Sequence, residues 1–386
     1  MSFNRTPGVY YDEDAEYELA GNGAKIPVII GATGNTGTAD YKVDGTAIQK
    51  FTGWDEVNRS IANGGIGTDT STNKSLAFFE EFFEESEVKS SDQLGVPYVY
   101  FIDVGAGTNK TAWTTALTTA KTMPEAIVEA YVGADNITDY TLSSFIAGAV
   151  ASIATETHNL NLRTGFFTKE AATDSELIAL NPATTGILSS RMFLCEPLLF
   201  GKTVARFCCT PYYVEPGFIV YRSVTPGTFK ARTKAEKTAL QNAGVIFNFD
   251  EKVDTDVYCR INLSTSTSFA KTNRPADALG HARFNADNLL RQIFKAIYPQ
   301  VKDNESASNI VKRQTKVDSI IDAEVEAERM IPYNSSTGDG TKLTLVESDS
   351  DPYDMILEGQ IQPINCTGAI LVKAKIKNPA VIAVEN

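Results

Sequence analysis

The amino-acid sequence predicts a multidomain protein of α/β and α+β class that carries an extended, strand-forming arm at each end. Its 386 residues, of which 42% are hydrophobic, can form two to three domains with cores of their own. From residue 96 onward, apolar runs of strand length alternate with helical patterns, which is typical of a sheet covered by helices. At both ends of the chain, polar residues instead follow the two-residue period of a strand.

The N-terminal arm is expected over residues 1–24. Pro7 and Gly8 interrupt regular structure, and the next three residues favour a strand because they are β-branched or aromatic. These strand formers are Val9, Tyr10 and Tyr11. Four acidic residues then fall on one strand face: Asp12, Asp14, Glu16 and Glu18.

A buried strand is predicted at 25–31, and the region 31–75 is expected to be loop-rich because Gly, Thr, Asn and Asp dominate it. At 76–88 the spacing predicts a surface helix with two unlike faces. Its phenylalanines are expected to dock on the core: Phe78, Phe79, Phe82 and Phe83. Its glutamates are expected to face outward: Glu80, Glu81, Glu84 and Glu85.

The segment 96–224 has the pattern of a sheet whose strands are covered on both faces, because its strand-like runs are continuously apolar. Strands are predicted at 96–104, 125–133, 191–200, 203–214 and 217–224, and helices at 111–122 and 141–158.

The C-terminal third is predicted to begin with a helix that ends at Gly244 and leads into a strand. An amphipathic helix over 284–299 ends at Pro299, and a more charged helix follows at 305–330. A turn rich in Ser, Gly and Asp at 334–340 separates this helix from two strands, which are expected at 341–348 and 354–364.

The C-terminal arm is expected over residues 366–386. Three lysines alternate on one strand face: Lys373, Lys375 and Lys377. Its apolar members are Ile370, Val372 and Ile376. Because a lone strand cannot satisfy its backbone, each arm is expected to add to a sheet, either in its own chain as a solvated edge strand or in a neighbouring subunit. Acids facing lysines would contribute ~0.2–1 kcal/mol per pair, enough to favour one register.

The charge balance argues against nucleic-acid binding. The chain has 35 basic and 48 acidic residues, a net charge of −13, so a phosphate backbone would be repelled on average. No stretch of 18 consecutive apolar residues occurs, and the first residues lack the pattern of a secretory signal. We therefore predict no nucleic-acid partner, no membrane insertion and no export by a leader.

Cysteine and histidine usage gives little basis for catalysis or metal binding. The five cysteines lack metal-ligand spacing, and their odd number favours reduced thiols in a cytosolic compartment: Cys195, Cys208, Cys209, Cys259 and Cys366. Only His158 and His281 could serve a hydrolytic triad, and both suit helix-terminal or core roles better. The sequence has no G-x-S-x-G motif. We predict no catalytic, cofactor or metal site.

One motif favours a different function. VIIGATGNTG at 28–37 resembles the Gly-rich turn of NAD(P)-binding oxidoreductases, whose backbone N–H groups hold a pyrophosphate. The continuation has no helical apolar stripe, and no strand ending in a charged residue follows about 20 residues later. The Tyr-x-x-x-Lys signature of short-chain dehydrogenases is also absent. An NAD(P)-dependent oxidoreductase stays the alternative function.

Several segments together resemble the contractile tail sheath proteins of bacteriophages, tailocins and related injection systems. TPGVYYDED followed by KIPVIIGATGNTGT is similar to the sheath opening, and TKAEKTALQNAGVIFNFD to a sheath helix that leads into a strand. HARFNADNLLRQIFKAIYPQV occupies the place of a later sheath helix, with Arg283 and Arg291 instead of an Arg-Arg pair. LEGQIQPINCTGAILVKAKI resembles the closing strand and arm. Residues 40–95 resemble nothing in the family.

The resemblance implies an N-terminal arm at 1–24, an α/β outer domain at 25–210 with a variable region at 40–95, a C-terminal core domain at 211–365 and a C-terminal arm at 366–386. It implies no enzymatic activity. Subunits would form hexameric rings stacked helically around a tail tube, with arms exchanged between neighbours, and contraction would drive the tube through a target envelope. Partners would be the tube protein, the baseplate and the tail terminator.

The resemblance also implies a location in a virion tail or tailocin particle, assembled in the host cytoplasm. Within the family a helix of the C-terminal domain attaches to the tube, so Lys312, Arg313 and Lys316 are possible tube-facing residues. A solvated helix face is the alternative for these three. Another strand-donating virion or surface-lattice protein is the remaining alternative for the whole chain.

Overall fold

The computed structural model describes most of the chain between residues 25 and 364. The described ranges are 25–35, 42–63, 65–66, 73–87, 94–138, 140–158, 162–180, 187–221, 223–253, 255–268, 279–297, 307–347 and 355–364. Both predicted arms lie outside these ranges. The arm residues named above, from Val9 to Glu18 and from Ile370 to Lys377, therefore stay predictions.

A seven-stranded sheet forms the centre of the molecule, in the order β2-β3-β1-β4-β5-β6-β7. Its strands are parallel except for β2, which runs antiparallel to β3 at one edge. The strands are β1 Ile26–Gly31, β2 Ile48–Phe51, β3 Val99–Asp103, β4 Ala126–Val132, β5 Thr164–Phe167, β6 Met192–Cys195 and β7 Val245–Ile246.

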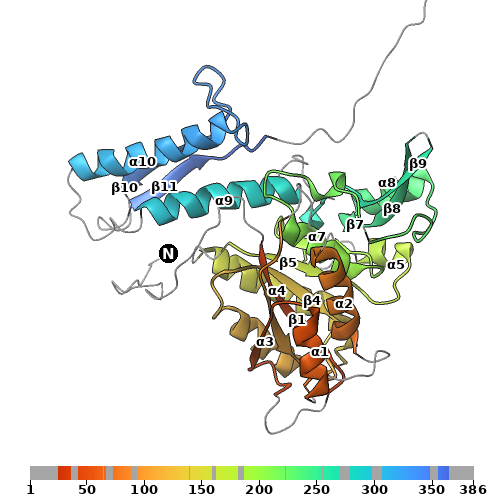
Figure 1. Cartoon of the computed structure of the whole chain (residues 1–386). Helices are drawn as coiled ribbons and strands as arrows, with labels where there is room; N and C mark the ends of the chain where they lie inside the picture. Colours follow the sequence, from red (N-terminus) through yellow and green to blue (C-terminus); the bar gives the residue numbers. More distant parts are fainter. Residues whose placement is uncertain are drawn as a thin grey trace, which may run out of the picture.

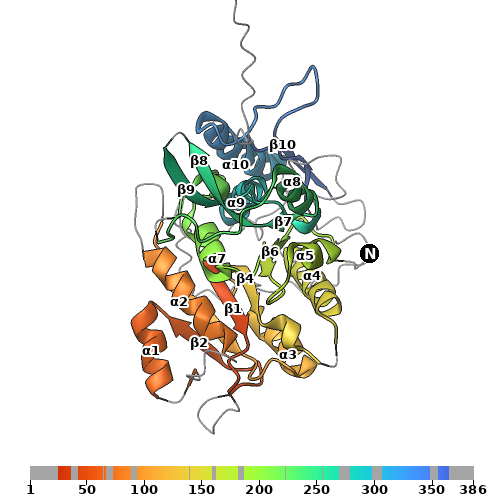
Figure 2. The same ribbon diagram turned by 90° about the vertical axis from the view of Figure 1, so that its right-hand side faces the viewer.

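Helices cover both faces of this sheet, as the continuous apolar runs predict (Figure 2). One face packs against α1 Trp54–Ala62, α2 Lys74–Glu87 and α7 Phe200–Cys209. The other packs against α3 Lys110–Ala120, α4 Leu142–His158, α5 Asp174–Ala179 and α8 Lys234–Asn242. The four phenylalanines of α2 are buried in the first of these layers, which confirms their predicted docking on the core. Two short 3-10 helices complete this part, η1 Ala134–Asn136 and η2 Pro216–Phe218.

Two antiparallel hairpins lie outside the sheet. The first is formed by β8 Asn248–Val253 and β9 Asp256–Ile261. The second is formed by β10 Lys342–Glu347 and β11 Met355–Gln360, and it packs on two long helices, α9 Gly280–Ile297 and α10 Ala307–Glu326. Figure 1 shows α9, α10 and the second hairpin together at one end of the molecule. We call these four elements the C-terminal unit.

The C-terminal unit has a small core of its own and is fixed to the sheet by charged groups. The buried apolar residues of this core are Leu289, Ile293, Val317, Ile321, Met330 and Leu343. At its junction with the sheet, Asp287 of α9 accepts two bonds from Arg191, just before β6, at 2.6 and 2.7 Å. A buried bidentate pair of this kind fixes orientation as well as distance.

Three local predictions are wrong. Residues 203–214 are not a strand, since most of them belong to helix α7, and 217–224 contains the 3-10 helix η2 instead of a strand. All ten residues of α7 are buried, and Lys202 and Arg206 form a polar stripe at helical spacing that the strand prediction overlooked. The region 31–75 is less loop-rich than predicted because it contains β2 and α1.

The predicted boundary between outer and core domains at 210/211 stays a prediction. The sheet itself continues beyond that position, because β7 pairs with β6 through Leu194 and Val245. The sheet therefore draws its last strand from sequence that the resemblance assigns to the second domain.

Candidate functional site

The carboxyl end of the parallel strands is the first place to examine, because ligands of open α/β sheets bind there. After β1 the backbone N–H of Ala32 donates to Val132 O at 3.0 Å. The N–H groups of Thr33 and Gly34 both donate to Gly105 O, at 2.8 and 2.9 Å. These are the donors that a dinucleotide turn offers to a pyrophosphate. Because carbonyls of the chain already accept them, the turn does not present the cradle that the NAD(P) alternative requires.

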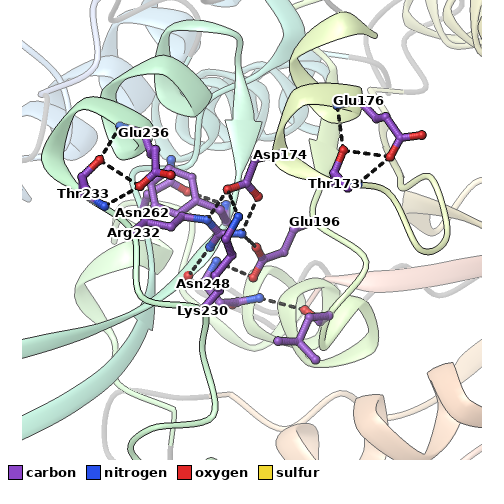
Figure 3. Close-up of polar contacts among 12 residues, drawn as sticks. Thr173, Asp174, Glu176, Glu196, Lys230, Arg232, Thr233, Glu236, Asn248 and Asn262 are labelled. Carbon is purple, nitrogen blue, oxygen red and sulfur yellow. Dashed lines mark hydrogen bonds and ion pairs between the residues drawn. The ribbon is translucent and has the colours of Figure 1, made fainter.

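A cationic side chain of the protein itself occupies the same edge at β6 (Figure 3). Arg232 donates to both oxygens of Asp174, at 2.8 and 3.0 Å, and to Glu196 at 2.7 Å. Lys230 adds a bond to Asp174 at 2.9 Å, and the backbone N–H of Asn248 donates to Glu196 at 2.9 Å. The hydrogen bonds from Arg232 lower the pKa of Asp174 to about 2. This network joins α5, β6 and β8 and has a structural role.

Two capping boxes visible in the same view start α5 and α8. Thr173 and Glu176 bond reciprocally at the first, and Thr233 and Glu236 do so at the second. Each box satisfies backbone donors that a helix start leaves free. They hold the two helices beside the Arg232 network.

Glu81 and Glu85 of α2 face α7, which corrects their predicted outward position, whereas Glu80 and Glu84 are exposed as predicted. Glu85 and Arg206 form an ion pair with side chains 0% and 1% exposed. Glu84 pairs with Lys202 at 2.7 Å, and Glu81 accepts the backbone N–H of Gly201 at 2.8 Å. This contact was not predicted from the sequence, because the residues of α7 were expected to form a strand. Burial raises the pKa of Glu81 to about 7, against the lowering effect of the Gly201 N–H and Lys202.

Gly201 makes the close approach of these two helices possible. A Cβ atom at this position would lie 2.3 Å from the carbonyl oxygen of Phe78 on α2. Since that oxygen belongs to the backbone, a larger residue would force the helices apart. The α2–α7 contact is therefore a fixed packing interface.

Lys25 is buried at the start of the described chain. Its Nζ donates to the carbonyls of Phe207, at 3.0 Å, and Thr210, both at the end of α7. The ammonium also lies 4.8 Å from the centre of the Phe284 ring on α9. Burial lowers the pKa of Lys25 to about 8. The lysine satisfies carbonyls that the helix end leaves free.

The histidine and cysteines fit the expected structural roles. His281 lies at the start of α9, where Nδ1 is 2.6 Å from Glu215 Oε2, and both side chains are buried. The side chain of His158 and all of Cys366 lie outside the described residues. The four described cysteines are free and buried. Within the described ranges, no group of three or more Cys, His, Asp or Glu side chains is placed to hold a metal ion.

The β10–β11 hairpin is the best candidate for an interaction site. It is a two-stranded sheet, and no other described strand continues it. Its inner face packs on α9 and α10, while Lys342, Thr344, Glu358 and Gln360 are exposed. The outer edges of a two-stranded sheet carry backbone N–H and C=O groups that pair with no strand, and such edges bind further strands.

The three possible tube-facing residues lie on α10 but do not share one environment. Lys312 and Lys316 are exposed, whereas Arg313 is only 4% exposed. The sequence reasoning missed Gln314, which bonds the edge of β10. The available signal was its spacing from Val317 and Ile321, which places all three on the inner stripe of the helix. Tube contact stays a prediction.

The fold defined by these elements is that of contractile sheath proteins. Over 97% of this chain and 99% of the other, it superposes with a TM-score of 0.64 and 12% identity on a chain of the anti-feeding prophage helical sheath in its contracted state. A chain of the PVC sheath complex, from an extracellular contractile injection system, gives 0.65 and 10% over 98% and 99%. A sheath tail protein from Desulfitobacterium hafniense gives 0.59 and 10% over 92% and 96%.

Sequence comparison identifies no relative of this chain. No protein-family model matches this sequence, and no curated protein matches it. Within the described residues, no helix is both long and apolar enough to cross a membrane. The likeness is therefore one of fold, and it extends from one end of the chain to the other.

Proposed function

We propose that this chain is the structural subunit of a contractile sheath. Subunits would polymerise as stacked hexameric rings around a tail tube, and the sheath would contract to drive the tube through a target envelope. The observation that carries the proposal is the end-to-end match in fold, which includes both the α/β part and the C-terminal unit.

The chemistry of the described chain supports a role without catalysis. The edge of the sheet where α/β enzymes hold ligands is occupied by the chain's own carbonyls and by Arg232. The open hairpin, in contrast, suits assembly. Partners follow from the proposed role: other copies of the chain, a tube protein, a baseplate and a terminator, in a phage tail or tailocin assembled in the host cytoplasm.

Strand exchange is the proposed link between subunits. Backbone ladders are tolerant of sequence and keep their geometry when whole domains move, so arms paired in this way can hold subunits together while other contacts re-form. Interfaces that re-form are expected to be polar, as contacts between domains usually are. Val9 to Glu18 and Ile370 to Lys377 are the proposed exchanged segments.

Electron microscopy of the chain co-expressed with its tube protein tests this function. We expect hollow tubular polymers of sheath width that surround the tube. Rings or sheets that never enclose a tube would instead favour a surface-lattice or other virion protein. A monomer that stays unassembled at high concentration and binds NAD(P)H in a fluorescence titration would support the oxidoreductase alternative.

A further inference from the structure

A loop between α10 and β10 is the most exposed segment of the C-terminal unit. All eight residues of 332–339 are exposed, which is the longest such run among the described residues. We call residues 332–340 the C-terminal loop; it projects beyond the end of α10 (Figure 1). Because the side chains of 332–339 contribute nothing to a core, packing within the subunit does not explain their identity.

Hydrogen bonds fix the shape of the C-terminal loop although its side chains are exposed. The backbone N–H of Asn334 donates to Asp339 O at 2.8 Å, and the Asn334 side chain accepts the Ser336 N–H at 2.9 Å. At the base of the loop, Gly340 donates its N–H to Gln362 Oε1 at 2.8 Å. A loop that is held in one shape before contact loses little conformational entropy on binding, so it is suited to recognition.

The composition of the loop is typical of loops that bind proteins. Residues 333–339 consist of Tyr, Asn, two Ser, Thr, Gly and Asp. The binding loops of antibodies are enriched in Tyr, Ser, Gly and Asn, because tyrosine supplies contact area at low entropic cost and the small polar residues adapt their hydrogen bonds. Tyr333 is 41% exposed, and Lys342 Nζ lies 4.7 Å from the centre of its ring. Tyr333 is therefore the candidate anchor of an interface.

The charge of the loop favours another copy of the chain as its partner. Asp339 is the single charged side chain in residues 332–340, and Lys342 balances it at the base. The whole chain carries a net charge of −13, so two copies repel each other on average. Contacts between copies therefore form at the least electrostatic cost through surfaces that have no net charge, and the C-terminal loop is such a surface.

We propose that the C-terminal loop binds the surface of a second copy in the assembled polymer, with Tyr333 as the anchor of the contact. This inference rests on the proposed polymerisation and adds a contact that is separate from strand exchange. The loop offers side chains, whereas an exchanged strand is held by its backbone. Because these side chains are exposed in the single chain, the contact should affect the concentration needed for polymerisation and leave the stability of the subunit unchanged.

Photochemical cross-linking in the full chain tests this contact. The photoreactive residue p-benzoylphenylalanine replaces Ser336, and the chain is assembled alone or with its tube protein and then irradiated. Products are measured on a denaturing gel and located by peptide mass spectrometry. We expect a covalent dimer of two copies in polymers of the chain alone, and none below the concentration needed for polymerisation. The same replacement at Thr118, exposed on α3, is the matched control and should give several-fold less dimer.

The site of the cross-link separates the possible partners. A cross-link from position 336 to residues 25–364 of a second copy supports the proposal. Cross-links to the tube protein alone would overturn the choice of partner, and cross-links confined to residues 1–24 or 366–386 would show that the loop only lies beside an exchanged arm. Equal dimer yields from positions 336 and 118 would indicate random collision and overturn the contact.

Polymers that form without any cross-link from position 336 would overturn the inference and leave the proposed function intact. Failure of the unsubstituted chain to polymerise would contradict the proposed function itself, and the inference with it.

Tyr333→Ala tests the anchor directly. Truncating an aromatic anchor weakens an interface about tenfold or more, so we expect the concentration at half polymerisation, measured by sedimentation, to rise by that factor. Tyr333→Phe is the matched control and should lose less, since it keeps the ring. Thermal unfolding of both variants below the polymerisation concentration should match the unsubstituted chain. An unchanged concentration for Tyr333→Ala, or an equal rise for Tyr333→Phe, would show that the ring is not the anchor.

Discussion

The α/β part and the C-terminal unit differ in how far each satisfies its own polar groups. In the α/β part, the strand ends are closed by carbonyls of neighbouring turns and by Arg232, and the α2–α7 contact buries a complete ion pair. The C-terminal unit has six buried core residues and a two-stranded sheet that no described strand extends. The α/β part satisfies its polar groups internally. The C-terminal unit has strand edges that a further chain could pair with.

The largest expected loss of stability lies in the α/β part. Arg206→Ala leaves Glu85 buried without its partner, and breaking a buried pair in this way costs about 3–5 kcal/mol of unfolding free energy. Chemical denaturation of the purified chain measures it. Arg59→Ala is the control, because the side chains of Arg59 and its partner Glu56 on α1 are 72% and 31% exposed, so water can replace the arginine. We expect less than about 1 kcal/mol there. Equal losses of unfolding free energy in the two variants would contradict the distinction between a buried and an exposed ion pair.

In the C-terminal unit, Gly359→Ala is expected to destabilise the β10–β11 hairpin. Gly359 has φ +143°, and a Cβ would lie 2.0 Å from the carbonyl oxygen of Lys342. We expect a loss of about 2–3 kcal/mol, seen as faster amide exchange in β10 with little change in β1. Gly338→Ala is the control, since it also has positive φ but open space around it. Its cost should be about 1 kcal/mol.

A pH effect is expected in the α2–α7 contact. The pKa of Glu81 is raised to about 7, above its ordinary 4.5, so the folded protein holds this proton more tightly than the unfolded chain. Stability should therefore fall as pH rises from 4.5 to 7 and stay reduced above. Glu81→Gln should flatten this slope and add about 1–2 kcal/mol at pH 8, as read from denaturation midpoints. Glu80→Gln, on the exposed face, should change the slope far less, because the Glu80 charge makes only the smallest contribution to the raised pKa of Glu81.

The smallest effect per interaction is expected between the arms. Replacing Lys373, Lys375 and Lys377 with glutamate sets like charges against the acidic arm, at ~0.2–1 kcal/mol per pair. The summed effect should raise the concentration needed for polymerisation, measured by sedimentation. The same replacement at exposed Lys42, Lys110 and Lys234 matches the change in net charge. Long sheaths from the arm variant at unchanged concentration would contradict the register.

Sequence reasoning succeeded where a single pattern dominates a segment. β1, β3 and β4 are continuous apolar runs, and α2 repeats phenylalanines at helical spacing, so local periodicity identifies them. The strands β10 and β11 were also predicted from their strand-like runs, but their pairing as a hairpin was not. The fold class and the resemblance to sheath proteins are likewise confirmed at the level of fold.

Sequence reasoning failed where contacts between distant residues determine the structure. α7 is buried on every side, and its polar stripe of Lys202 and Arg206 contacts the glutamates of α2 instead of solvent. Glu85 looks like a surface residue until its partner Arg206, 121 positions away, is placed beside it. Gln314 bonds a strand 31 positions away, and nothing in the local pattern states that its amide replaces a strand. Such pairings are properties of the folded chain.

The burial of Lys25 has a mechanical consequence. Its backbone N–H bonds to Cys208 O at 2.9 Å, and its side chain bonds to the end of α7, so the residue is held at two points. Tension applied to the chain ahead of Lys25 would therefore enter the fold at α7. From there Arg206 and Gly201 would pass it to α2. Because Lys25 also leads directly into β1, a pull on the N-terminal segment would load the α2–α7 pair of helices together with a central strand of the sheet.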